Sequence, residues 1–256
     1  MIGCIIQART ASTRFPRKIL EKLDGEDSVL DFIIMQLKNS KYLDKTIIAT
    51  TTLERDDPIE KISKKHGLDC FRGTENDVLS RYYQCAKKFS IDTIVRVSSD
   101  DPLIDPKLLD KGIQIFNSKS FDVLSTNKPH TFPYGLDFEI FSFRSLEKIS
   151  KEANLPSERE HVTSFFYSHK KDFQIFNYKH EKNMSHIRCS LDHYEDLIFL
   201  RELVKKIRNR PILLNDILLA VEADPKLLEI NGKYEPDEGY FKSLNEDEQF
   251  IKNNKL

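Results

Sequence analysis

The sequence predicts an α/β fold, with a mainly parallel mixed sheet flanked by helices. Two observations lead to this prediction. Short apolar segments alternate with amphipathic segments over the first 120 residues, which is the rhythm of β-α-β units with right-handed crossovers. The pattern then changes to a less regular succession of strands and helices over residues 121–230, which indicates that the second half completes the same sheet. We therefore expect one domain over 1–230, with halves 1–120 and 121–230, and a polar tail over 231–256.

The elements of the first half follow from apolar runs and their capping residues. A helix over 29–37 has Asp27 or Ser28 available as its N-cap. Another helix opens at Asp57-Pro58, with proline at its first position, and ends at Gly67. The expected strands are 1–6, 46–50, 69–71 and 91–97, and two more helices are expected over 76–89 and from Asp105-Pro106 to Ile115.

The second half contains a proline-bearing loop over 127–135 and two helices between residues 141 and 173. The spacing of Ser157 and Glu160 predicts a capping box at the start of one of them. The tail over 231–256 is rich in Lys, Asp and Glu, and both a flexible end and an arm that docks on another subunit fit its composition. Strands are expected over 121–124, 136–141, 173–178 and 187–191, and an amphipathic helix over 194–207.

Composition narrows the function classes. The chain has 40 Lys and Arg against 41 Asp and Glu, so it lacks the excess of cations that a general nucleic-acid-binding surface needs. It contains no apolar run of about 18 residues and no signal-peptide pattern, so we expect no membrane span and no membrane partner. Its four cysteines are scattered without a C-x-x-C pair, which is typical of buried thiols in a reducing compartment. We therefore expect a cytoplasmic protein.

A basic loop follows the N-terminal strand. It carries Arg9, Arg14, Arg17 and Lys18 within ten residues, together with the small residues 11–13. Ligands of open α/β sheets lie outside the carboxyl ends of the strands, and Arg and Lys are the side chains that bind phosphate oxygens. The loop therefore predicts a polyphosphate site, although a solvated basic loop after an edge strand also fits.

Residues 5–20 resemble the I-I-x-A-R-x-x-S-T-R-x-P-x-K-x-L signature of the cytidylyltransferases that make CMP-activated sugars. The resemblance is to the spore-coat polysaccharide branch in particular, and more distantly to the CMP-Kdo synthetases. Gln7 departs from the Pro that CMP-Kdo synthetases carry, and Ala11 departs from the Gly that many members carry. The resemblance implies a Rossmann-like nucleotidyltransferase fold, CTP as a substrate and Arg9, Arg14 and Lys18 as catalytic residues. Implied nucleotide contacts in this segment are Gln7, Ala8, Arg9, Ser12, Arg14 and Lys18.

Two carboxylates outside the loop resemble the metal ligands of the same family. Asp100, after the strand over 91–97, matches an x-x-D-x-P-L element, and Asp192 matches the first residue of D-x-x-E-D-L. The resemblance implies that both hold Mg²⁺, with Asp100 also next to the nucleotide. A turn or N-cap role fits Asp100 as well, and Asp101 is expected to be structural. Glu195 and Asp196 are expected in the first turn of the following helix, where acids are favoured.

Further candidates are less specific. Arg72, Gly73 and Thr74 resemble the family's turn beside the nucleotide, although Thr74 or Asn76 as a helix cap fits equally well. Arg81 is a weaker nucleotide-side candidate, and Arg96 is expected to pair with a carboxylate, for which Asp100 is one option. Resemblance to the spore-coat branch also implies acceptor-substrate contacts from Glu139, Arg159 and His161.

Taken together, the resemblance implies a Mg²⁺-dependent enzyme that transfers CMP from CTP to an acidic sugar, releases pyrophosphate and serves surface polysaccharide or glycan biosynthesis. A homodimer is expected by analogy. Three alternatives stay open at this point. The acceptor could be a phosphonate or a polyol phosphate, or the chain could be a nucleotide-sugar-dependent glycosyltransferase, although it lacks the Asp-x-Asp typical of that class. The third alternative is a non-catalytic nucleotide-binding protein.

Overall fold

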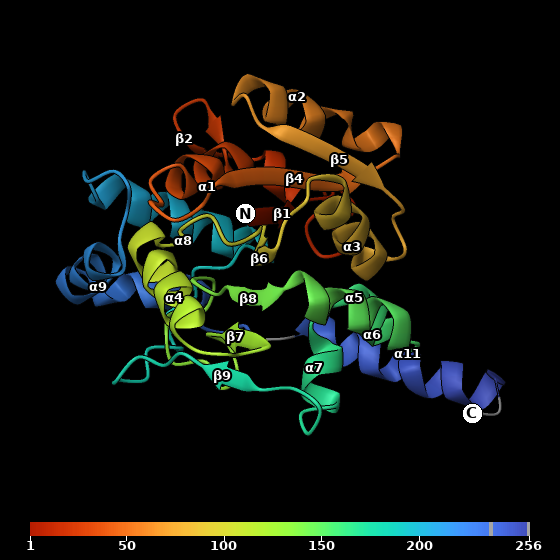
Figure 1. The fold of residues 1–256 in the computed structure, drawn as a ribbon. Coiled ribbons are helices and arrows are strands. Elements are labelled where there is room, and N and C mark those ends of the chain that lie inside the picture. The colour runs from red at the N-terminus through yellow and green to blue at the C-terminus, as the bar shows by residue number, and fades with distance from the viewer. Residues whose placement is uncertain (236–237, 255–256) are drawn as a thin grey trace.

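The protein is built around one seven-stranded sheet, described here from a computed structural model that covers residues 1–235 and 238–254. The strand order is β5-β4-β1-β6-β8-β7-β9 (Figure 1). Among these strands only β8 runs antiparallel to its neighbours β6 and β7, so the sheet is mixed and mainly parallel, as predicted. The strands are β1 Ile2–Gln7, β4 Lys45–Thr51, β5 Asp69–Gly73, β6 Thr93–Ser98, β7 Val123–Ser125, β8 Glu139–Ser142 and β9 Ile175–Asn177.

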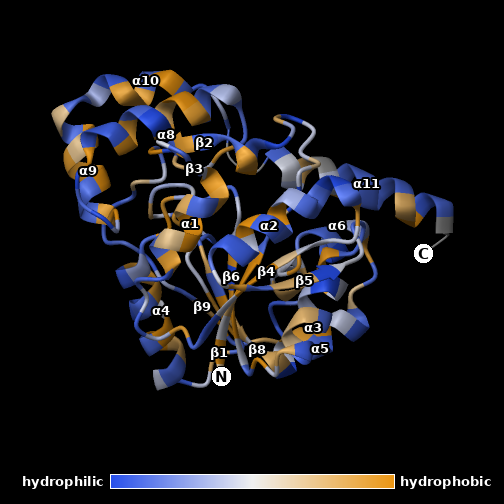
Figure 2. Ribbon diagram, turned by 90° about the horizontal axis from the view of Figure 1, so that it is seen from above, coloured by the Kyte–Doolittle hydropathy of each residue, from blue (hydrophilic) through white to orange (hydrophobic). Residues whose placement is uncertain are grey.

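Helices cover both faces of this sheet. Seen from above, α1 and α4 lie on one side of the strands and α3 and α5 on the other (Figure 2). A small hairpin, β2 Lys22–Asp24 and β3 Asp27–Ser28, precedes α1. The α-helices are α1 Val29–Leu37, α2 Asp57–Lys65, α3 Val78–Lys88, α4 Pro106–Ser118, α5 Phe143–Glu152, α6 Pro156–Glu160, α7 Ser164–Ser168, α8 Tyr194–Lys206, α9 Leu214–Ala223, α10 Leu228–Asn231 and α11 Glu238–Asn254. Short 3₁₀ turns occupy η1 Lys18–Leu20, η2 Glu54–Asp56 and η3 Pro225–Leu227.

Successive side chains of a strand point to opposite faces of the sheet, so the sheet separates two apolar clusters of the core. Ile5 and Ile6 are adjacent in β1 and fully buried, yet they belong to different apolar clusters because successive strand side chains point to opposite faces. Ile6 packs with the α1, α2 and α4 side, and Ile5 with the α3, α5 and α7 side. A third cluster lies among β2, α1, α8 and α9. Cys4, Cys85 and Cys189 are buried free thiols and Cys70 is partly exposed, which agrees with the expectation of unpaired cysteines.

Local sequence signals account for most element boundaries. Ser28 is the N-cap of α1 and shares a capping box with Asp31. Of the two N-cap candidates predicted from sequence, Asp27 and Ser28, the second is therefore confirmed. Gly67 follows α2 with φ +68°, a conformation that glycine adopts without steric cost. The predicted cap of α3 was wrong: Asp77, rather than Thr74 or Asn76, accepts the hydrogen bond from the Ser80 N–H.

Two predictions for the second half were wrong. Residues 187–191 form no strand; they pair with the loop at Tyr134, which makes an isolated bridge to Arg188. Gly135 explains the close approach, because a Cβ there would lie 2.4 Å from the Ser190 nitrogen. The strand expected over 136–141 begins only at Glu139, since the Asp137 carboxylate accepts the Gly135 N–H and holds the preceding turn.

The capping box predicted from Ser157 and Glu160 was also wrong. Pro156 is the first residue of α6, so Ser157 lies inside the helix. Glu158 accepts the N–H groups of Asn154 and Leu155, both at 3.2 Å, and therefore caps the helix instead.

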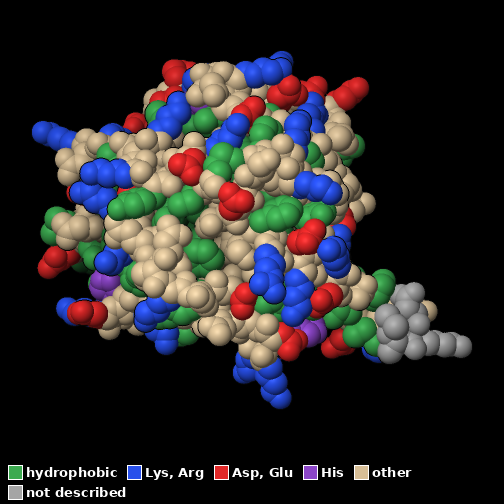
Figure 3. All heavy atoms as spheres, viewed as in Figure 1, with side chains coloured by type: hydrophobic (Ala, Val, Ile, Leu, Met, Phe, Trp, Pro, Cys, Tyr) green, Lys and Arg blue, Asp and Glu red, His purple; other side chains and the backbone are tan. Residues whose placement is uncertain are grey.

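The polar tail contains a long helix. α11 packs against α6 and extends past it toward the C-terminus (Figure 1). Asp247 fixes this contact by accepting the Ser157 N–H at 2.8 Å and the Ser157 hydroxyl at 2.5 Å. Residues 236–237 and 255–256 of the predicted tail lie outside the described part of the chain. None of the described helices is long and apolar enough to cross a membrane. Lys and Arg side chains are interspersed with Asp and Glu over the face shown in Figure 3.

Strand direction gathers polar residues at one edge of the sheet. β1 ends at Gln7 opposite Ser98, the last residue of β6. Because β8 is antiparallel, its first residue, Glu139, reaches the same edge opposite Arg96. The fold thus places the ends of two parallel strands and the start of an antiparallel strand around one space.

Candidate active site

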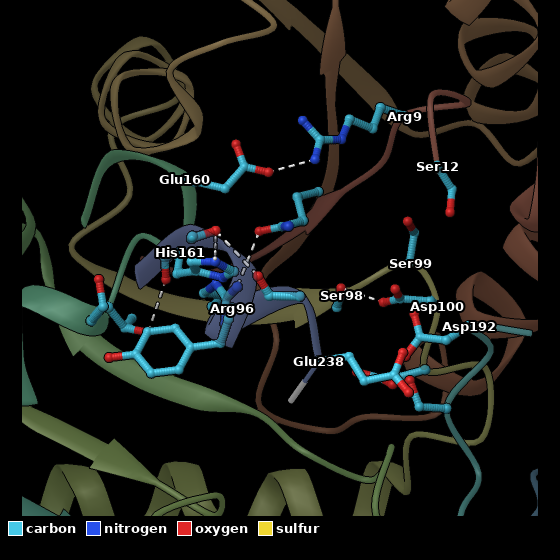
Figure 4. A pocket seen from close by; sticks show the side chains of 18 of the residues that line it. Arg9, Ser12, Arg96, Ser98, Ser99, Asp100, Glu160, His161, Asp192 and Glu238 are labelled. Atoms are coloured by element: carbon cyan, nitrogen blue, oxygen red, sulfur yellow. Dashed lines mark hydrogen bonds and ion pairs between the residues drawn. The ribbon is translucent and has the colours of Figure 1, made fainter. Parts of the chain in front are cut away.

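A large pocket opens at this carboxyl edge of the sheet, with a volume of about 1080 Å³. Its walls come from the basic loop, the segment after β6, the loop over 127–135, the segment around α6, the residues before α8 and the helix α11. Figure 4 shows the basic loop facing Asp100 and Asp192, with Glu160 and His161 on the other side. The pocket brings together most of the predicted site residues: Gln7, Arg9, Ser12, Arg14, Lys18, Asp100, Glu139, Arg159, His161 and Asp192.

The basic loop is held by one buried carboxylate. Asp56, in η2, accepts the Thr10 N–H at 2.8 Å and the Thr10 hydroxyl at 2.7 Å. The Thr10 carbonyl in turn accepts the N–H groups of Ser12 and Arg17. Ala8 is buried and extends β1 by donating to the Ala49 carbonyl. These bonds fix the backbone of the loop, and the side chains of Arg9, Arg14 and Lys18 line the pocket.

Lys18 lies between the two predicted metal ligands. Its Nζ is 2.7 Å from Asp100 Oδ2 and 2.9 Å from Asp192 Oδ1, and it also donates to the Leu191 carbonyl. Burial would lower the pKa of Lys18, but Asp100 and Asp192 outweigh burial and raise it. Burial would raise the pKa of Asp192, but Lys18, then Arg14 and Arg188, lower it. Both directions keep the groups charged at neutral pH.

Asp192 is positioned by residues that sequence reasoning did not identify. Arg188 donates to Asp192 Oδ2 at 2.9 Å and to Asp196 Oδ1 at 2.9 Å. Asp196 also accepts the N–H groups of Asp192 and His193, which confirms its predicted role at the start of α8. The spacing of Arg188, Asp192 and Asp196 at intervals of four was the available signal, but it crossed from a predicted strand, which held Arg188, to a predicted helix, which held Asp196.

Two other cations of the loop, Arg9 and Arg14, also form ion pairs. Arg9 Nη2 contacts Glu160 Oε1 at 2.5 Å, and Arg14 Nη2 contacts Asp192 Oδ1 at 2.5 Å (Figure 4 shows the first pair). Arg14 also reaches Glu238 of α11 at 3.4 Å, a residue that sequence reasoning left in the tail. Arg17 is exposed and does not line the pocket.

A second polar cluster lies around Glu139, whose side chain is buried. Its carboxylate accepts hydrogen bonds from Arg96 at 2.8 Å, the Thr163 hydroxyl at 2.7 Å and the Tyr167 hydroxyl at 2.9 Å. Arg96 therefore pairs with Glu139 rather than with Asp100, the partner considered from sequence. Arg96 also donates a hydrogen bond to the Gln7 side-chain oxygen at 3.3 Å.

Arg159 and His161 reach the pocket from the segment around α6. The Arg159 Nε is 3.1 Å from Asp77 Oδ1, and its Nη1 donates to the Ser150 carbonyl, so Arg159 joins α6 to the cap of α3. His161 Nε2 lies 2.8 Å from the Ser243 hydroxyl of α11. Burial lowers the pKa of His161 to about 4, with Arg96 next in effect, so the ring is neutral at pH 7.

Arg72, Gly73 and Thr74 do not line the pocket. The Arg72 guanidinium donates to the carbonyls of Thr51 and Leu53 and pairs with Asp57 at 2.7 Å. Arg72 thus links β5 to the start of α2. The contacts of this turn, which was predicted to lie beside the nucleotide, are therefore structural. Arg81 is buried and donates to the Thr74 carbonyl.

Two carboxylates of the pocket suit a magnesium ion. Within residues 1–235 and 238–254, no cluster of three or more His, Cys, Asp or Glu side chains could hold a metal. Asp100 and Asp192, however, both approach one cationic atom, the Lys18 Nζ, within 2.9 Å. Mg²⁺ is usually held by one or two carboxylates together with substrate phosphates. The donor set therefore fits a magnesium site that a phosphate ligand completes.

The chain is similar to known proteins over most of its length. Residues 3–219 match the cytidylyltransferase family. The chain is 31% identical to the spore coat polysaccharide biosynthesis protein SpsF of Bacillus subtilis, over 81% of this chain and 88% of that protein. It is 30% identical to a 3-deoxy-manno-octulosonate cytidylyltransferase of Nitratiruptor, over 52% and 60% respectively. A solved cytidylyltransferase from Leptospira borgpetersenii superposes with a TM-score of 0.87 at 34% identity, covering 91% of this chain and 99% of the other. The chain therefore belongs to the cytidylyltransferase family.

Proposed function

We propose that this protein transfers the CMP group of CTP to a sugar, in a Mg²⁺-dependent reaction that releases pyrophosphate. The observation that carries the proposal is the position of Lys18. Its ammonium group stands between Asp100 and Asp192 at the end of an arginine-bearing loop, inside a pocket large enough for a nucleotide and a second substrate. The names of the relatives support a sugar acceptor and a role in surface polysaccharide synthesis.

In the proposed reaction, a sugar hydroxyl oxygen forms a bond to the α-phosphorus of CTP. The bond between that phosphorus and the oxygen bridging to the β-phosphorus breaks, pyrophosphate leaves, and the hydroxyl proton passes to water. The main obstacle is negative charge, so catalysis depends on positioning and charge neutralisation. Arg9, Arg14 and Lys18 bind the phosphates and stabilise the departing pyrophosphate. A magnesium ion held by Asp100 and Asp192 would neutralise phosphate charge and lower the pKa of the attacking hydroxyl.

Arg9, Arg14 and Lys18 are each paired with a carboxylate, so phosphate binding is an exchange of partners. Arg9 leaves Glu160, and Lys18 leaves the two carboxylates, as phosphate oxygens take their place. Asp192 keeps Arg188 throughout, because that arginine contacts its other oxygen. The exchange lets one small region hold the phosphates and the metal in adjacent positions.

On the acceptor side, two of the three predicted residues have positioning roles. Glu139 accepts three side-chain hydrogen bonds and Arg159 is bound to Asp77 and backbone carbonyls, so neither has its main bonding capacity free. His161, neutral and at the pocket wall, is available to bond an acceptor hydroxyl. The homodimer and the cytoplasmic location expected from sequence remain predictions.

Pyrophosphate release tests the proposal directly. The purified chain is incubated with CTP, Mg²⁺ and one acceptor at a time: 3-deoxy-manno-octulosonate and other sugar acids, neutral sugars, a phosphonate, and glycerol 3-phosphate. Release with a sugar, dependent on both CTP and Mg²⁺ and abolished in Lys18→Ala, supports the proposal. Release only with glycerol 3-phosphate or the phosphonate would move the function to a non-sugar acceptor. Turnover of a nucleotide sugar in place of CTP would show that the reaction is glycosyl transfer and not cytidylyl transfer.

A further inference from the structure

Almost every Lys or Arg in the pocket wall is neutralised by a carboxylate. The pairs are Arg9 with Glu160, Arg14 with Asp192 and Glu238, Lys18 with Asp100 and Asp192, Arg96 with Glu139, and Arg159 with Asp77. Lys128 is the exception among the described residues, because it lines the pocket without an ion pair. Its charge is therefore available to a ligand.

Two aromatic rings hold the Lys128 ammonium in place. Its Nζ lies 4.2 Å from the centre of the Tyr167 ring and 4.9 Å from that of Tyr240. Such contacts orient a cation through the negative faces of the rings, but they leave its charge and its N–H donors in use for other partners. Tyr167 is fixed by its hydroxyl bond to Glu139, and the Tyr240 ring stands edge-on to His161 at 5.3 Å.

The charge distribution separates the two ends of the pocket. Near Lys18, the cations of the basic loop and the carboxylates of Asp100 and Asp192 are assigned to the phosphates and the metal ion of the proposed reaction. Near Lys128, the positive charges of Arg96 and Lys128 both act to lower the pKa of His161, after burial as the largest cause. An anionic group on a second substrate is therefore best accommodated at the Lys128 end.

We propose that Lys128, held between Tyr167 and Tyr240, binds the negatively charged group of the acceptor, a carboxylate or a phosphate. The inference rests on the proposed function, since it concerns the acceptor of that reaction. Tyr240 lies in α11, beyond residues 3–219 that match the family. The C-terminal helix thus supplies one wall of the acceptor site, so acceptor choice depends on a part of the chain outside that match.

Calorimetric titration tests this binding without requiring turnover. Protein saturated with CTP in Mg²⁺-free buffer is titrated with 3-deoxy-manno-octulosonate, D-glucuronate, glycerol 3-phosphate and, as a neutral control, D-glucose. We expect at least one anion to bind and to lose about tenfold or more in affinity in Lys128→Met, which removes one charge-assisted bond. Lys128→Arg should stay close to wild type. If a sugar acid shows this loss of affinity, the bound group is a carboxylate. If glycerol 3-phosphate shows it, the bound group is a phosphate.

Matched variants separate a ligand contact from a structural one. Lys119→Met removes an exposed lysine outside the pocket and should change nothing. Tyr240→Leu should weaken binding of the same anion, whereas Phe241→Leu, at an outward-facing neighbour that is 61% exposed, should not. Binding of no anion, or equal affinity in wild type and Lys128→Met, would overturn the inference.

Different results would refute the Lys128 inference and the proposed function. If pyrophosphate release from CTP persists while Lys128→Met leaves the KM of the acceptor unchanged, only the Lys128 inference falls. If no variant and no wild-type sample releases pyrophosphate with any acceptor in the panel, the proposed function falls, whatever the anion titration shows.

Discussion

Lys18 and Asp192 lie 174 residues apart in sequence, yet their side chains form a buried ion pair of 2.9 Å. Removing two charges from water is costly, and the pair is retained here with Asp100, Arg14 and Arg188 around it. Each charge has several opposite partners, so a phosphate and a metal ion can replace the Lys18–Asp192 contact without leaving either group isolated. This pair is the centre of the proposed nucleotide and metal site.

Replacing Lys18 removes the cation from that centre. We expect Lys18→Ala to lower kcat/KM for CTP by about 100-fold or more, the size of effect seen when one charge-stabilising donor is lost. Pyrophosphate release at varied CTP measures the change. Lys22→Ala is the matched control, because Lys22 is exposed and pairs with Glu26 outside the pocket. Near-normal turnover in Lys18→Ala would remove this residue from the mechanism.

Replacing Asp192 tests the metal assignment separately. Asp192→Asn keeps the size of the side chain but removes its charge, so turnover should fall about 100-fold and half-maximal activity should need more Mg²⁺. A Mg²⁺ titration of initial rates gives both quantities. Glu195→Gln, in the first turn of α8 and paired with Lys233, should behave like wild type. An unchanged Mg²⁺ dependence in Asp192→Asn contradicts the assignment.

Arg9 is expected to bind phosphate oxygens once it leaves Glu160. Arg9→Ala should weaken CTP binding by about 10- to 100-fold, since hydrogen bonds to charged groups contribute about 1.5–3 kcal/mol. Glu160→Gln removes the competing carboxylate and should bind CTP at least as tightly as wild type. Calorimetry with CTP measures both variants. Weaker CTP binding in Glu160→Gln would show that the carboxylate positions Arg9 rather than competes for it.

The contact between α6 and α11 depends on Asp247. Asp247→Ala leaves the buried Ser157 N–H and hydroxyl without their acceptor, which costs about 1.5 kcal/mol or more. Backbone amides of α11 should then exchange with solvent about tenfold faster. Glu248→Ala, at the exposed neighbouring position, is the control. Equal exchange in all three proteins would mean that other contacts hold α11 in place.

Asp31 links stability to pH. Burial opposes ionisation, but Lys65, Ser28 and His66 outweigh it and lower the pKa of Asp31 to about 2. A lowered folded-state pKa stabilises the fold above the unfolded-state pKa of about 4, and the stabilisation disappears as pH falls toward 2. Asp31→Asn should therefore unfold more easily by about 2 kcal/mol at pH 6 and by little at pH 2. Urea denaturation measures this, and the half-exposed Asp27→Asn should show a much smaller effect. A constant difference across the pH range would disprove the linkage.

Sequence patterns predicted the sheet well because its strands are short apolar runs bounded by caps, such as Ser28 before α1 and Gly67 after α2. The predicted strand over 187–191 was wrong because an alternation of apolar and polar residues, Ile-Arg-Cys-Ser-Leu, also suits a buried loop. Arg188 faces Asp192 and Asp196 there, and the backbone pairs with Tyr134. Periodicity alone does not separate these two outcomes.

For the site, family resemblance selected Lys18, Asp100 and Asp192, and the structure brings the three together; their roles remain predictions. Composition suggested a polar tail, but the contact of Asp247 with Ser157 and the position of Tyr240 near Lys128 depend on tertiary packing. The pairing of Arg96 was likewise decided by strand direction, since only an antiparallel β8 brings Glu139 opposite it.

Thermal stabilisation by nucleotides tests the central claim most directly. The melting temperature is measured with CTP, ATP, GTP and UTP, each with and without Mg²⁺, for wild type and Lys18→Ala. A ligand at about 100 times its Kd adds about 2.7 kcal/mol of stability, which is readily detected. We predict a shift that is largest with CTP and Mg²⁺ and reduced in Lys18→Ala. No shift with any triphosphate, together with a shift for a nucleotide sugar, would contradict the account.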